Sequence, residues 1–76
     1  MIIKTETAIV DTNAYDSFFI EYRESKRDYR LLAVNKYTTN TIPLYTANDK
    51  RFVEAVLDDI YRRFNSGADS CIDLGV

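Results

Sequence analysis

The chain has 76 residues, enough for one domain, and 46% of them are hydrophobic while 29% are charged. This composition is that of a folded globular domain rather than a disordered chain. The formal net charge of −2 lacks the positive excess of a general nucleic-acid-binding domain, whose pI is usually above about 9. A chain of this length buries only about 60% of its unfolded surface. A partner protein or a second copy would cover more apolar area, so we expect one of the two.

The cysteine count bears on the compartment. Cys71 is the single cysteine, so no internal disulfide can form, whereas small secreted domains usually contain several. We also find no apolar run near the roughly 20 residues of a membrane span and no signal-peptide pattern in residues 1–6. We therefore expect a cytoplasmic protein without membrane association. Because Cys71 lies in an apolar stretch, we expect it to be a buried small residue.

The first elements in chain order are strands. Residues 2–10 are rich in Ile, Thr and Val, which suit a pleated strand. Residues 17–24 and 29–36 each alternate side chains with the period of two expected for a half-buried strand. The four residues 25–28 between them predict a hairpin.

Two further features position the strands in a sheet. The strand 29–36 has apolar residues on both faces, so we expect it at the centre. A fourth strand is expected at 41–45. Because Pro43 cannot donate a ladder hydrogen bond, this strand belongs at an edge or beside a bulge.

An amphipathic helix is predicted after the strands. Thr46 or Asn48 can cap its start, and Asp49 in the first turn favours the positive end of the helix dipole. Gly67 lies where a left-handed residue would end the helix, near Ser66. One face carries an apolar stripe at helical spacing, formed by Val53, Val56, Leu57, Ile60 and Phe64.

Charged pairs and a final strand complete the prediction. Asp58 with Arg62, and Asp59 with Arg63, are four residues apart in the favourable order, worth about 0.3–0.5 kcal/mol each. Residues 71–74 form a short last strand. The predicted fold is a single α+β domain over residues 1–76, in which a four-stranded antiparallel meander packs on one helix and a C-terminal strand follows.

Four segments carry a resemblance to a known group. They are the Ile-containing strand with an Asn turn at 9–13, the aromatic strand 18–22, the Tyr-led strand 29–34 and the helix 52–60, which ends at a Gly. In this order the chain resembles small uncharacterised proteins of Gram-positive bacteria and of their phages and mobile elements. The resemblance implies a phage or mobile-element origin, and it implies no activity and no site residues.

The residue types needed for catalysis are sparse. Histidine, the commonest general base and metal ligand, is absent. The two glycines cannot form a phosphate-binding loop. No calcium-binding loop pattern is present, and the adjacent Asp58 and Asp59 point to different helix faces. We therefore predict no catalytic residue, no metal site and no cofactor.

The distribution of charge and tyrosine suggests a binding surface instead. Residues 22–37 carry five basic and two acidic residues, a net of +3, whereas residues 1–21 carry a net of −3. Tyr and Arg together commonly anchor protein interfaces. We predict a non-enzymatic protein-binding module, whose form in a phage or mobile element would be an inhibitor of a host or defence protein, acting as a monomer or a homo-oligomer. The predicted binding residues are Arg23, Lys26, Arg27, Tyr29 and Arg30, with Arg51, Glu54, Asp58 and Arg62 as a second interface.

Two alternatives remain open at this point. The basic, tyrosine-bearing hairpin 22–37 has the residue types that stack on bases and contact phosphates, which indicates nucleic-acid binding. The other alternative is a pocket for a small ligand. Salt dependence distinguishes the first from a protein interface, and ligand-induced thermal stabilisation identifies the second.

Overall fold

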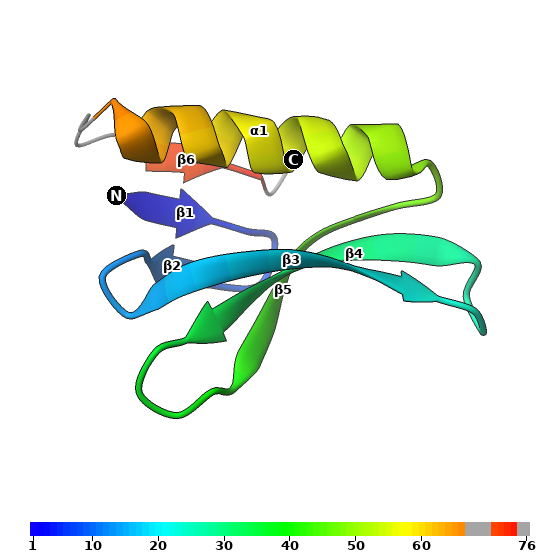
Figure 1. Cartoon of the computed structure of the whole chain (residues 1–76), viewed down its shortest axis with the longest axis horizontal. Helices are drawn as coiled ribbons and strands as arrows, with labels where there is room; N and C mark the ends of the chain where they lie inside the picture. The colour runs from blue at the N-terminus through cyan, green and yellow to red at the C-terminus, as the bar shows by residue number, and fades with distance from the viewer. Residues whose placement is uncertain (67–70, 75–76) are drawn as a thin grey trace.

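The computed structural model describes residues 1–66 and 71–74, and in these residues six strands form two small sheets beside one helix (Figure 1). The α+β class is therefore confirmed, whereas the single four-stranded meander is wrong. The elements are β1 (Ile2–Lys4), β2 (Ile9–Asp11), β3 (Tyr15–Arg23), β4 (Asp28–Asn35), β5 (Thr41–Ala47), α1 (Lys50–Asn65) and β6 (Cys71–Asp73).

The larger sheet is antiparallel and has the strand order β3-β4-β5. The predicted central position of β4 is confirmed. The register between β4 and β5 shifts after the pair Leu31–Tyr45, so that Leu32 faces Pro43. Pro43 therefore lies on an edge strand and beside a bulge, as its missing N–H requires.

The hairpin between β3 and β4 turns one residue earlier than predicted. Arg23 faces Asp28, so the connecting residues are 24–27 rather than 25–28. Arg27 adopts the left-handed backbone conformation with φ 53°, and its N–H donates to the Glu24 carbonyl at 3.3 Å. An ion pair between Arg23 and Asp28 closes this turn, which explains the shift.

The smaller sheet has the order β2-β1-β6 and was not predicted. The expected strand 2–10 breaks at Thr5, whose hydroxyl accepts a hydrogen bond from the Ala8 N–H at 2.9 Å. The Thr5 N–H in turn donates to the Ala8 carbonyl at 2.8 Å. Such local bonding favours a turn over an extended strand. The chain then doubles back, and β1 pairs antiparallel with β2 and parallel with β6.

The start of helix α1 differs from the prediction. Asp49 is the cap, because its carboxylate accepts a hydrogen bond from the Arg51 N–H at 2.9 Å. Thr46 lies within β5, which continues to Ala47, and Asn48 precedes the cap residue, so neither caps the helix. A carboxylate at this position satisfies one of the unpaired N–H groups of the first turn.

The predicted end of the helix near Ser66 is confirmed. Ser66 is the C-cap, and its N–H donates to the Arg62 carbonyl at 3.0 Å. Gly67, which we expected to end the helix, lies outside the described residues.

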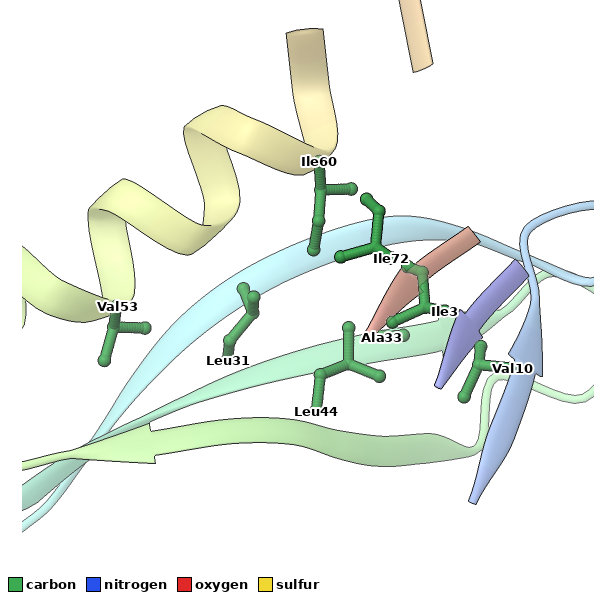
Figure 2. Close-up of a cluster of buried hydrophobic side chains, with 8 residues drawn as sticks. All are labelled: Ile3, Val10, Leu31, Ala33, Leu44, Val53, Ile60 and Ile72. Atoms are coloured by element: carbon green, nitrogen blue, oxygen red, sulfur yellow. The ribbon is translucent and has the colours of Figure 1, made fainter. Parts of the chain in front are cut away.

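One apolar cluster joins the helix to both sheets (Figure 2). Val53 and Ile60 extend from α1 toward the sheets and are almost fully buried, which confirms the centre of the predicted stripe. Phe64 at the end of that stripe stays 49% exposed. The cluster consists of Ile3, Val10, Leu31, Ala33, Leu44, Val53, Ile60 and Ile72.

Cys71 is exposed, so its predicted burial is wrong. Side chains of a strand alternate between faces, and in β6 it is Ile72 that points into the cluster while Cys71 and Asp73 point outward. An apolar neighbourhood in sequence was therefore a poor guide to the face on which Cys71 lies.

Two isoleucines of the smaller sheet test whether it stabilises the domain. Ile72 is 5% exposed and Ile9 is 72% exposed. We expect Ile72→Ala to lower the free energy of unfolding by about 2–5 kcal/mol, through lost burial and the cavity left behind. Ile9→Ala should lower it by less than about 1 kcal/mol. Urea denaturation followed by circular dichroism measures both, and equal losses would contradict the assignment of Ile72 to the core.

Candidate functional site

The strands of the predicted basic hairpin neutralise much of their own charge. Arg23 donates two hydrogen bonds to Asp28, from Nε at 2.8 Å and from Nη2 at 2.6 Å. Arg30 donates from Nε at 3.2 Å and from Nη2 at 2.7 Å to one oxygen of Glu21. Two of the five predicted binding residues are therefore engaged within the hairpin.

The five predicted residues also do not share one surface. Arg23 and Arg30 lie on the sheet face that points away from the helix, because side chains alternate along β3 and β4. Tyr29 lies on the opposite face, packed against the core, with its ring 4.9 Å from that of Tyr22. The remaining two, Lys26 and Arg27, are exposed in the turn.

Two ion pairs lower the pKa of a carboxyl group: Arg23 with Asp28 in the hairpin, and Arg51 with Asp49 at the start of α1. Hydrogen bonds from the Arg23 side chain hold the pKa of Asp28 below its ordinary value, against the opposing effect of burial. The Arg51 side chain, and after it the Arg51 N–H, lowers the pKa of Asp49 in the same way. Asp28 is the more sheltered, with a side chain only 11% exposed. Both pairs hold the backbone in place, one at the hairpin turn and the other at the start of α1.

The second predicted interface lies on the exposed side of α1. Its basic residue Arg51 is paired with Asp49 at 2.7 Å. All four of its members are exposed: Arg51, Glu54, Asp58 and Arg62.

One of the two predicted helix ion pairs forms. Arg63 and Asp59 are 3.3 Å apart, which confirms that pair. Within residues 1–66 and 71–74, no ion pair joins Asp58 to Arg62, so that prediction is wrong. Asp58 instead lines a groove beside the helix.

The groove lies between strand β3 and the C-terminal half of α1 and has a volume of about 590 Å³. Its floor is apolar, and two of its aromatic side chains are largely open to solvent, Tyr61 at 66% and Phe64 at 49%. Large apolar side chains that are left exposed in a concave site mark binding surfaces. The lining residues are Asp16 and Phe18 from β3, and Leu57, Asp58, Ile60, Tyr61, Phe64 and Asn65 from α1.

An acidic residue that lies in a β-bulge, Asp16, lines this groove. The register of β3 against β4 runs from Tyr15 to Ser17 and skips Asp16. Bulges commonly redirect a side chain at the end of a strand. Asp16 and Asp58 thus approach the groove from two elements, and neither has an ion-pair partner among the described residues.

The groove was not predicted from the sequence, although a signal for it exists. Leu57, Tyr61 and Phe64 follow the spacing i, i+4, i+7, which widens the apolar stripe beyond what one sheet can cover. The predicted apolar stripe included Leu57 and Phe64 but not Tyr61. Leu57 packs against the core cluster as well as lining the groove, whereas Phe64 stays exposed. A stripe this wide indicates a second surface to be covered.

Comparison of the chain with protein-family models, with curated proteins and with solved structures finds no match. Among the residues that the structure describes, no group of three His, Cys, Asp or Glu side chains is placed to hold a metal ion. The same part of the chain has no helix that is long and apolar enough to cross a membrane. The geometry of the groove and of the hairpin is therefore the basis for a function.

The Arg23–Asp28 ion pair gives a pH-dependent prediction. Because the pKa of Asp28 is lowered in the folded chain, the pair stabilises the fold above about pH 4 and is lost as the pH falls through the folded-state pKa. We expect Asp28→Asn to lower the urea midpoint at neutral pH, and the difference from wild type to shrink in acid.

The control for this experiment is Asp58→Asn, since Asp58 is exposed and forms no ion pair in the described chain. Its urea midpoint should follow that of the wild type at both pH values. A deficit of Asp28→Asn that stays constant down to acid pH would contradict the role given to the ion pair.

Proposed function

We propose that this protein is a non-enzymatic protein-binding module that receives a segment of a partner in the groove between β3 and α1. The observation that supports this most is the exposure of Tyr61 and Phe64 at an apolar groove. Aromatic side chains that insert into a partner contribute much of the binding free energy in protein interfaces. Exposed aromatic surface does not stabilise a small domain until a partner buries it.

The groove is a better candidate than the basic hairpin for a physical reason. Arg23 and Arg30 already donate to Asp28 and Glu21, so a partner would have to break these bonds. Lys26 and Arg27 in the turn and Lys36 after β4 are exposed and form no ion pair within residues 1–66 and 71–74, so their charge is free for a partner. Nucleic-acid binding through the hairpin remains the alternative, with fewer unpaired basic side chains than the sequence indicated.

For the partner we propose a host or defence protein that this small chain inhibits by occupying it. The support is the resemblance in element order to proteins of phages and mobile elements, together with the 76-residue length of a chain with no histidine. Binding of this kind needs no chemistry from the protein, and the same groove on a second copy would give a homo-oligomer.

Substitution of the two exposed aromatics tests the proposal. We expect Tyr61→Ala and Phe64→Ala each to weaken partner binding by about 10-fold or more, because hot-spot aromatics cost over about 1–2 kcal/mol when truncated. Tyr37→Ala is the matched control, since Tyr37 is 77% exposed in the turn between β4 and β5. The measurement is quantitative mass spectrometry of proteins retained from nuclease-treated bacterial lysate.

Variants of the hairpin turn distinguish a groove interface from nucleic-acid binding through the hairpin. A partner lost with Tyr61→Ala and kept with Tyr37→Ala supports the groove. A partner that is retained only when nuclease is omitted, and that is lost only with the double variant Lys26→Glu, Arg27→Glu, would contradict the groove proposal. It would identify the hairpin as a nucleic-acid site. Circular dichroism of each variant confirms that the fold is retained.

A further inference from the structure

We infer that the groove binds an extended peptide segment that adds as a fourth strand to the outer edge of β3, with a Lys or Arg side chain placed between Asp16 and Asp58. Within residues 1–66 and 71–74, no strand pairs with this edge. This inference rests on the proposed function and specifies the conformation and charge of the partner segment. Strand addition beside a helix is a recurrent mode of peptide recognition, in which the backbone gives affinity and alternate side chains give specificity.

The two outer edges of the larger sheet, β3 and β5, differ in how readily they can pair with an added strand. In an antiparallel sheet an edge strand directs alternate N–H and C=O groups away from its neighbour. The edge formed by β5 is interrupted by Pro43 and by the bulge beside it, two devices that prevent pairing. Strand β3 is nine residues long, and its irregularity is confined to the start, between Tyr15 and Ser17. The stretch from Phe18 to Arg23 can therefore pair with an added strand.

A strand added beside β3 would meet an apolar surface. Phe18 of β3 lines the groove together with Leu57, Tyr61 and Phe64 of α1. A strand beside β3 turns every second side chain toward the helix face of the sheet. One large apolar side chain in such a position would cover both exposed aromatics.

The groove also carries negative charge. Asp16 and Asp58 are exposed, line the groove from opposite sides and have no ion-pair partner in residues 1–66 and 71–74. Carboxylates at the rim of a binding site select a partner of opposite charge and repel an acidic one. The segment should therefore carry a Lys or Arg close to its apolar anchor.

Selection from a library of random linear peptides displayed on phage tests the charge. Wild-type protein should enrich peptides with Lys or Arg next to a large apolar residue. The double variant Asp16→Lys, Asp58→Lys should bind these peptides about tenfold more weakly and should enrich Asp or Glu instead. A variant with Glu6→Lys and Glu24→Lys, both exposed and absent from the groove lining, controls for net charge and should keep the wild-type preference.

N-methylation of one backbone amide at a time in a selected peptide tests the strand geometry. Strand addition predicts that binding is lost at every second position, because alternate N–H groups face β3. Calorimetry with each methylated peptide measures the pattern. Loss without this period of two, or an unchanged charge preference in the Asp16→Lys, Asp58→Lys variant, would overturn the inference.

The two failures are distinguishable. Peptides that bind wild type but lose affinity with Tyr61→Ala, with no period of two and no charge preference, would overturn the inference and leave the proposed groove function standing. If the selected peptides bind the Tyr61→Ala and Phe64→Ala variants as well as wild type, or if no peptide is selected, both the inference and the proposed groove function would be overturned.

Discussion

Burial of the central strand on both faces is the constraint on which the rest of the structure depends. Leu31 and Ala33 are fully buried on the helix side of β4, and Leu32 is 3% exposed on the other. Such a strand needs a neighbour on each side, and the hairpins to β3 and β5 supply them. Helix α1 then covers the face with Leu31, the smaller sheet closes the end of the same cluster (Figure 2), and the groove remains beside the edge strand.

The sequence predicts well those elements whose signal is local. The alternation in 17–24 and 29–36 and the helical stripe around Val53 and Ile60 each arise because one face of a single element is buried, so the pattern is visible within that element. A one-residue error in the turn had a larger effect on the candidate site than on the fold. It hid the fact that Arg23 faces Asp28 across the hairpin, so that Arg23 is engaged in an ion pair rather than free to bind a partner.

The parts that the sequence did not predict depend on contacts between distant segments. Strands β1 and β6 have three residues each and pair across nearly the whole chain, so neither has enough periodicity to reveal the sheet. The turn at Thr5 depends on one hydroxyl, whose bond to Ala8 outweighs the strand preference of its neighbours. The groove was missed because it is a property of β3 and α1 together, and only the register shows that Asp16 lies in a bulge.

The two exposed aromatic residues of the groove, Tyr61 and Phe64, lie outside the core, which bears on how the protein can evolve a binding surface. Tyr61 and Phe64 do not belong to the core cluster, whereas Ile60 belongs to it, and Phe18 and Leu57 pack against it while also lining the groove. Substitutions at Tyr61 and Phe64 can therefore tune affinity at little cost to a core that is already small. Conversely, a bound segment stabilises the fold by mass action, by about 2.7 kcal/mol at a free concentration of 100 times its Kd. For a domain of this size such a gain is a large fraction of the total stability, so occupancy of the groove and persistence of the fold are coupled.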